Sequence, residues 1–192
     1  AAFAQTVKVT FRVNMQNVAV GPKGLRIAGD LQADAGIGSN WTPGATGNTL
    51  TPPNGSSFVY SIQLTLKAST SYEYKYINGD AWGMPDESFN RKLTTGTSDQ
   101  VLDVYCFNDA SADCSAPPTG TQRVVFQVDM KNEDVSADGV RVAGNYQTKA
   151  GMASDWNPSN DTAKCKNVGD MYYLVAFLPA GDYKYKFVNG KS

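Results

Sequence analysis

Histidine is absent from this 192-residue chain. Its absence removes the commonest general base, the Ser-His-Asp and Cys-His nucleophile systems, and every metal site that uses imidazole. Two carboxylates could still hydrolyse a glycosidic bond. However, the adjacent acids Asp86 and Glu87 fall in a stretch that the second half of the chain lacks. We therefore expect no catalytic residue, no metal site and no cofactor.

Charge of either sign is also scarce, and so are long apolar runs. With 17 basic and 18 acidic residues the net charge is −1, which does not provide the clustered Lys and Arg that bind nucleic acid. No apolar run approaches the roughly 20 residues of a membrane-spanning helix. We predict a partner that is neither nucleic acid nor a membrane.

Cysteine occurs only three times. Cys106 and Cys114 bracket a short polar segment and are predicted to form a disulfide, which is typical of an oxidising compartment. Cys165 is left over, and its pairing with Cys114 or with a cysteine beyond Ser192 stays open. Ala2 and Ala4 fit the −3 and −1 positions of a signal-peptide cleavage site, so residues 1–5 are predicted to be a signal-peptide remnant, although a frayed apolar tail is the alternative. We expect the protein to be secreted or on the cell surface.

In place of these features the chain has an internal repeat. The pattern Val-x-Phe-x-Val-x-Met-x-Asn begins at Val9 and again at Val124, an offset of 124 − 9 = 115. The pattern Tyr-x-Tyr-Lys-x-x-Asn-Gly begins at Tyr72 and again at Tyr183, an offset of 183 − 72 = 111. A repeat of roughly 100 residues is large enough to bury its own core. We therefore predict two modules in tandem.

The expected boundaries follow from composition. We predict a first module at residues 6–107, an exposed Pro-containing linker at 108–120, and a second module at 121–192. The second module stops opposite residues 80–81 of the first, so we expect it to be truncated at its C-terminus. We expect the chain to act as a monomer within a larger protein.

Most ordered segments alternate between apolar and polar residues, as strands do. The predicted strands lie at residues 7–15, 25–28, 59–66, 72–76, 91–93 and 101–105. Short strands separated by turn residues, with no helical stripe, indicate an all-β protein made of immunoglobulin-like β-sandwich domains. The stripe of Tyr72, Tyr74 and Tyr76 is predicted to lie in the core.

Each module carries a tryptophan in a long polar loop. Trp41 lies in Asn-Trp-Thr-Pro and Trp156 in Asp-Trp-Asn-Pro. A tryptophan among Gly, Ser, Asn and Pro is not expected to be wholly buried. The first module has a second tryptophan, Trp82, with Lys75 before it on the tyrosine-rich strand and Asn90 after it.

The order of residues 24–30, 40–43, 72–77 and 89–91, with Trp82 between them, resembles the starch-binding domains of amylases and glucoamylases. It is also similar to the glycogen-binding domain of AMP-activated kinase β subunits. The resemblance covers the first module and the first three quarters of the second. It implies an exposed tryptophan platform on which glucose rings stack, with polar side chains bonding the hydroxyls. The contact residues that it implies are Trp41, Lys75, Trp82 and Asn90, and in the second module Trp156 and Lys186.

The resemblance implies non-catalytic binding of a polysaccharide, an α-glucan such as starch or glycogen. One departure is Gly83, which stands directly after Trp82 where the family has an acidic residue. Two alternatives stay open. In one, the modules are structural or adhesive repeats of a cell-surface protein, and their loop tryptophans cap the core. In the other, they are the targeting portion of a larger secreted glycoside hydrolase.

Overall fold

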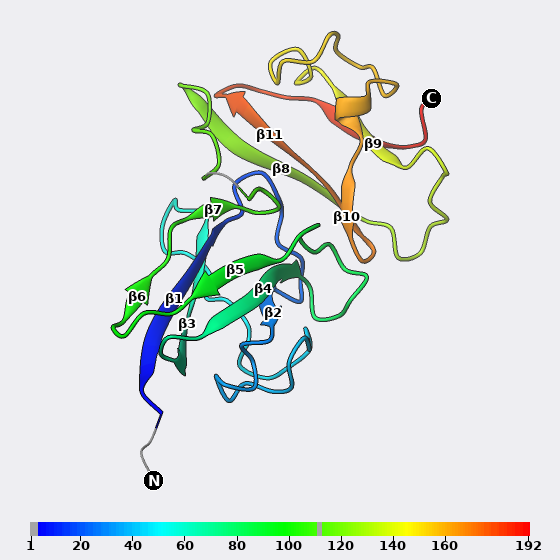
Figure 1. The fold of residues 1–192 in the computed structure, drawn as a ribbon. Helices are drawn as coiled ribbons and strands as arrows, with labels where there is room; N and C mark the ends of the chain where they lie inside the picture. Colours follow the sequence, from blue (N-terminus) through cyan, green and yellow to red (C-terminus); the bar gives the residue numbers. More distant parts are fainter. Residues whose placement is uncertain (1–3, 111–112) are drawn as a thin grey trace. The chain divides into compact units, whose positions relative to one another are not determined.

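The computed structural model describes residues 4–110 and 113–192 (Figure 1). It divides into two compact units, Ala1–Cys114 and Ser115–Ser192, called unit 1 and unit 2 here. The division point falls inside the predicted linker, residues 108–120. Residues 1–3 of the predicted signal-peptide remnant and residues 111–112 of the linker lie outside the described residues.

Both units are built from strands, which confirms the predicted all-β class. The described residues of unit 1 form two sheets (Figure 1). The strands of the first sheet, in order, are β3 (Val59–Lys67), β1 (Thr6–Asn14) and β6 (Gln100–Val101), with β7 (Tyr105–Cys106) also paired to β1. The strands of the second sheet are β2 (Leu25–Gly29), β4 (Ser71–Asn78) and β5 (Arg91–Thr94).

The core of unit 1 lies between these two sheets. Tyr72, Tyr74 and Tyr76 point inward from β4 and are at most 5% exposed, so the predicted core stripe is confirmed. The rings of Tyr74 and Phe11 meet edge to face with centroids 4.9 Å apart, which joins β4 to β1. The Tyr76 hydroxyl donates to the Arg12 carbonyl at 3.2 Å. This bond satisfies the one polar atom that the stripe places deepest in the core.

The predicted strand at residues 101–105 is instead two short strands, β6 and β7. Both pair in parallel with β1, but the register changes between them: Val9 faces Gln100, whereas Val13 faces Tyr105. The partner numbers therefore differ by 91 at the first pair and by 92 at the second. One extra residue has to bulge out between the strands, and the pairing is interrupted there.

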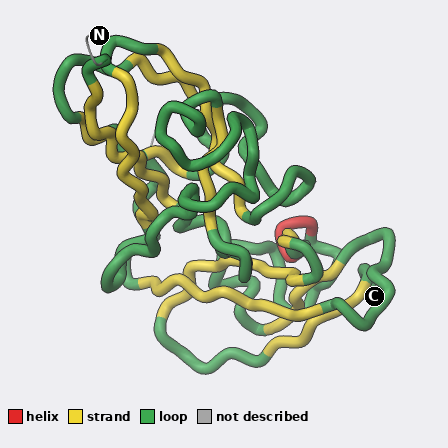
Figure 2. Tube along the Cα trace, turned by 90° about the horizontal axis from the view of Figure 1, so that it is seen from below, coloured by secondary structure: helices red, strands yellow, loops and turns green. Residues whose placement is uncertain are grey.

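Unit 2 also has two sheets. The first contains β10 (Lys166–Val168), β11 (Met171–Pro179) and β8 (Thr121–Asp129), and the second contains β12 (Tyr185–Asn189) and β9 (Val140–Gly144). A single turn of 3₁₀ helix, η1 (Asp161–Ala163), is drawn red in Figure 2. The part of the chain described here has no helix long and apolar enough to span a bilayer.

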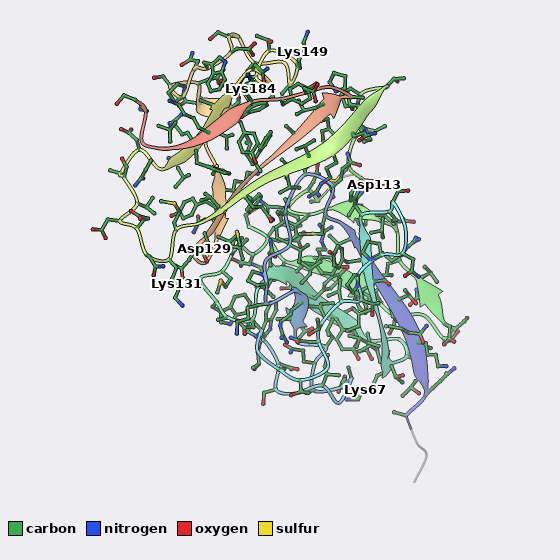
Figure 3. The ribbon with its side chains drawn as sticks, turned by 180° about the vertical axis from the view of Figure 1, so that it is seen from behind. Lys67, Asp113, Asp129, Lys131, Lys149 and Lys184 are labelled. Atoms are coloured by element: carbon green, nitrogen blue, oxygen red, sulfur yellow. A yellow bond between two sulfur atoms is a disulfide. The ribbon has the colours of Figure 1, made fainter. Side chains whose placement is uncertain are left out.

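Apolar side chains fill the space between the sheets of each unit. Charged side chains such as Lys67 of unit 1 and Lys149 of unit 2 lie on the outside of their units (Figure 3). In unit 2 the core centres on Phe126, whose ring lies 4.6 Å from that of Tyr146. Tyr185, the repeat counterpart of buried Tyr74, is 50% exposed. The difference arises because β4 is paired on both sides, whereas β12 pairs only with β9 among the described residues of unit 2.

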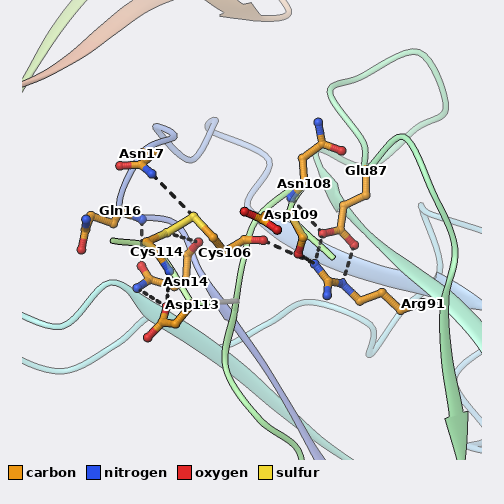
Figure 4. Close-up of a disulfide and its surroundings, with 10 residues drawn as sticks. All are labelled: Asn14, Gln16, Asn17, Glu87, Arg91, Cys106, Asn108, Asp109, Asp113 and Cys114. Carbon is orange, nitrogen blue, oxygen red and sulfur yellow. Dashed lines mark hydrogen bonds and ion pairs between the residues drawn. A yellow bond between two sulfur atoms is a disulfide. The ribbon is translucent and has the colours of Figure 1, made fainter. Parts of the chain in front are cut away.

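The predicted disulfide between Cys106 and Cys114 is present (Figure 4). It closes a small loop against β1, where the Asn14 side chain donates to Asp113 at 2.8 Å. Cys165 is free and buried in unit 2, so it does not pair with Cys114. Burial raises the pKa of the Cys165 thiol to about 12.

Candidate functional site

The long loop that follows β2 is held by hydrogen bonds from polar side chains. Arg26, on β2, donates through Nη1 to the Ala45 carbonyl at 3.1 Å and to Asn48 Oδ1 at 2.9 Å. Asn48 is fully buried and donates in turn to the Pro43 carbonyl at 2.8 Å. The loop is therefore ordered by directed hydrogen bonds instead of by an apolar core of its own.

The loop tryptophans share an uncommon backbone conformation. Trp41 has φ 57° and Trp156 has φ 56°, both in the left-handed region that bulky residues rarely adopt. Such a residue costs about 1–3 kcal/mol and persists only where its surroundings fix it. The Trp41 N–H donates to the Gly29 carbonyl at 3.0 Å, and the Trp156 N–H donates to the Gly144 carbonyl at 3.1 Å. Both loops thus hold the tryptophan in the same strained geometry.

A buried glutamine fixes the residue after each tryptophan. In unit 1 the Gln32 Oε1 accepts from the N–H of Thr42 at 2.9 Å, and its Nε2 donates to the Thr42 carbonyl at 2.9 Å. Gln147 makes the same pair of bonds with Asn157, at 2.9 and 2.8 Å. Sequence reasoning did not single out either glutamine. The available signal was that they are 147 − 32 = 115 residues apart, the repeat offset.

Trp41 and Trp82 lie together. Their ring centroids are 6.5 Å apart and the ring planes are tilted by 34°. The indole Nε1 of Trp82 donates to the Trp41 carbonyl at 3.2 Å, which ties the second ring to the first loop. Trp82 is 48% exposed and Trp41 is partly exposed. The pair therefore forms a partly open aromatic surface and not a plug in the core.

Lys75 lies beside this pair. It is on β4, opposite Ala28 of β2, and its Nζ is 6.0 Å from the centroid of the Trp82 ring. The same Nζ forms an ion pair with Asp86 at 2.8 Å, and the Lys75 side chain is only 15% exposed. Asp86 thus brings a carboxylate to the rim of the platform, although Gly83 occupies the position directly after Trp82. No sequence motif assigned Asp86 to the site.

Asn90 is bonded elsewhere. Its Nδ2 donates to Glu73 Oε2 at 3.1 Å, and Glu73 also pairs with Lys92 at 3.3 Å. The hydrogen bond from Asn90, together with Lys92, lowers the pKa of Glu73. Asn90 lines a cleft of about 220 Å³ whose walls include neither tryptophan nor Lys75. The structure therefore brings together three of the four predicted contact residues of unit 1, and Asn90 belongs to a neighbouring cluster.

Glu87 has a structural role, because it is paired with Arg91 (Figure 4). It is fully buried and forms an ion pair with Arg91, whose Nη2 lies 2.6 Å from Glu87 Oε1. Arg91 Nη2 also donates to the Asp109 carbonyl at 3.0 Å, inside the loop that the disulfide closes. Because Asp86 pairs with Lys75 and Glu87 with Arg91, the two adjacent acids are held by separate cations.

Unit 2 repeats only part of this arrangement. Trp156 is 48% exposed. Lys186, on β12, faces Ala143 of β9 in the same register in which Lys75 faces Ala28. Unit 2 has no other tryptophan in its sequence. It therefore presents a single indole ring where unit 1 presents two. In the described residues of either unit, no cluster of three or more acidic, His or Cys side chains could hold a metal ion.

Comparison with known proteins gives a family. The family described as "Pullulanase X25 domain" matches residues 25–114 and 139–192, one segment in each unit. Two curated relatives are amylopullulanases. That of Thermoanaerobacterium saccharolyticum is 27% identical over 172 residues, and that of Thermoanaerobacterium thermosulfurigenes is 26% identical over 171. Each alignment covers 86% of this chain, but the chain spans only 12% and 8% of the relatives' lengths.

Two solved structures match in part. A glycoside hydrolase family 15 glucoamylase from Hypocrea jecorina is 24% identical with a TM-score of 0.43, over 56% of this chain and 18% of that one. A pullulanase from Bacillus acidopullulyticus is 15% identical with a TM-score of 0.33, over 94% of this chain and 28% of that one.

Proposed function

The chain belongs to the pullulanase X25 domain family, and we propose that it is a non-catalytic module that binds an α-glucan on the tryptophan platform of unit 1. The curated relatives are named amylopullulanases, and this chain corresponds to a small part of their length. We place the module, on this basis, within a larger secreted enzyme whose catalytic residues lie elsewhere.

One observation carries the proposal: the tilted, partly exposed pair of Trp41 and Trp82. The faces of a glucose ring carry C–H groups that pack on an aromatic plane, while its rim carries hydroxyls that need hydrogen-bond partners. Two rings tilted by 34° suit consecutive sugars of a curved chain better than a flat one. Lys75 and Asp86 supply a donor and an acceptor beside the Trp82 ring.

Unit 2 contributes a weaker contact in this proposal. Trp156 offers one ring, with Lys186 on the adjoining strand as a hydroxyl partner. A single ring binds a sugar weakly because few bonds offset the ordering of the chain. Linked to unit 1, it would raise the overall affinity for a long polysaccharide, since the second binding event becomes intramolecular.

The test is affinity electrophoresis in gels that contain starch, glycogen, pullulan or, as a control, a β-linked glucan. We expect retardation by the three α-glucans, and its loss in Trp82→Ala and in Trp41→Ala with a melting temperature close to that of the wild type. Trp156→Ala is the matched tryptophan variant and should reduce retardation only in part. A wild-type chain that no α-glucan retards, or a Trp82→Ala variant that is still fully retarded, contradicts the proposal.

A further inference from the structure

The two tryptophans are connected through one peptide group. In the peptide that joins Trp41 to Thr42, the N–H donates to Gln32 Oε1 at 2.9 Å, and the carbonyl accepts from Trp82 Nε1 at 3.2 Å. This peptide is trans, so its N–H and C=O point in opposite directions within one plane. Fixing the N–H on one side therefore aims the carbonyl on the other.

We propose that Gln32 is a positioning residue that sets the tilt between the Trp41 and Trp82 rings. It acts through the rigid peptide plane and does not touch the sugar. Its consequence for affinity rests on the proposed function of the platform. Its consequence for ring geometry does not.

A glutamine is well suited to this position. Its oxygen accepts from the N–H of Gly29 at 3.2 Å as well as from Thr42, and its nitrogen donates to the Thr42 carbonyl. The side chain is fully buried, so each of these groups would be costly to leave unpaired. Among side chains of this length, only an amide both accepts and donates without carrying a charge.

Unit 2 shows that the glutamine contacts form without a second tryptophan ring. Gln147 makes the same three bonds, to Gly144 at 3.2 Å and to Asn157 at 2.9 and 2.8 Å. Trp156 has the same left-handed φ as Trp41. This unit has no second tryptophan in its sequence, so the glutamine arrangement does not depend on a ring pair. In unit 1 we therefore infer that Gln32 orients the peptide without help from Trp82. The Trp82 indole then donates to the carbonyl in the orientation that Gln32 sets.

The first test reads ring geometry without any ligand. The full chain has three tryptophans and thus three indole N–H signals in an NMR spectrum, which Trp82→Phe and Trp156→Phe assign. In Gln32→Met the shape is nearly kept, but the oxygen that accepts from the Thr42 N–H is lost. We expect the Trp82 indole signal to shift and to exchange faster with water, while the Trp156 signal stays in place. Gln63→Ala, an exposed glutamine on β3, is the matched control and should move neither signal.

The second test is a double-mutant cycle with starch in affinity electrophoresis. Gln32→Met should weaken binding by roughly fivefold in the wild-type background but hardly at all beside Trp82→Phe, whose ring lacks the N–H. Gln32→Leu, which also removes the acceptor, replaces Gln32→Met if the methionine variant does not fold.

Equal losses in both backgrounds, or an unmoved Trp82 signal, would overturn the proposal, because Gln32 would then only support the fold. If the wild-type chain binds no α-glucan, the proposed function fails by itself. The indole signal then decides the role of Gln32 alone.

Discussion

Replacing Glu87 by glutamine probes the ion pair that anchors the segment between Trp82 and β5. Glu87 Oε1 accepts from Arg91 Nη2 at 2.6 Å and from the Asn108 N–H at 3.0 Å. Its Oε2 accepts from Arg91 Nε at 2.9 Å and from the Tyr76 N–H at 3.1 Å. Whichever oxygen becomes an NH₂ group would face two donors. Arg91 would also keep its charge in a site where its side chain is only 6% exposed.

The expected cost is large. Removing one partner of a buried pair typically destabilises a protein by about 3–5 kcal/mol, because the other charge stays buried without compensation. For a unit of this size, about 3 kcal/mol corresponds to a fall in melting temperature on the order of 10–20 °C. Differential scanning calorimetry and urea unfolding of the full chain measure both quantities.

The matched control is Glu73→Gln. Glu73 likewise forms an ion pair with a cation of β5, Lys92, and accepts a hydrogen bond from Asn90, but it does so at the surface. Its loss should leave the free energy of unfolding close to the wild-type value, because exposed ion pairs contribute little. If Glu87→Gln and Glu73→Gln had similar small effects, the reasoning about the buried pair would be wrong. A low-stability Glu87→Gln chain should also lose retardation by starch, because the segment that carries Asp86 is attached through this pair.

Three further predictions follow from single contacts. The hydrogen bond from Lys67 lowers the pKa of Asp34, so this carboxylate stabilises unit 1 above its unfolded pKa and the contribution is lost as pH falls through the lowered value; Asp34→Asn should show a shallower loss of stability in urea titrations from about pH 6 to about pH 2. Burial raises the pKa of Cys165 to about 12, so Ellman's reagent at about pH 8 should react with it only after denaturant is added, and fast reaction of the native chain would contradict its burial. Replacing Cys106 and Cys114 together by serine should lower the free energy of unfolding of unit 1 by roughly 2.5 kcal/mol, estimated from a loop that closes over a separation of 8 residues, and chemical denaturation measures it.

The sequence predicted those parts of the fold that depend on local alternation. The tyrosine stripe at Tyr72, Tyr74 and Tyr76 was identifiable because every second residue of a strand faces the same way. It did not predict the interruption between β6 and β7. That feature depends on a one-residue mismatch with β1, a strand about 90 residues away, and alternation within the segment carries no information about its partner's register.

The candidate site was predictable to a similar extent and for a related reason. Trp41 and Trp82 stood out because tryptophan is uncommon in polar loops, and Lys75 followed from the resemblance to starch-binding domains. Gln32 and Asp86 did not, because their importance lies in what they contact after folding. A glutamine in a loop is ordinary until its amide is seen paired with both backbone groups of one residue.

The two units differ in which features they share: both hold one tryptophan ring in the same way, but only unit 1 has a second ring. Gly29 and Gly144 are needed alike, because an added Cβ would lie 2.3 Å from the backbone carbonyl oxygen of Glu73 in unit 1 and of Lys184 in unit 2. The left-handed tryptophan and its buried glutamine also occur in both units. Trp82, by contrast, belongs to unit 1 alone. The repeated features therefore hold one indole in each unit, and Trp82 adds a second in unit 1; under the proposed function, this pair is the surface offered to consecutive sugars. On this reasoning, we expect unit 1 to bind an α-glucan more tightly than unit 2 because it has Trp82, and not because of the loop that holds Trp41.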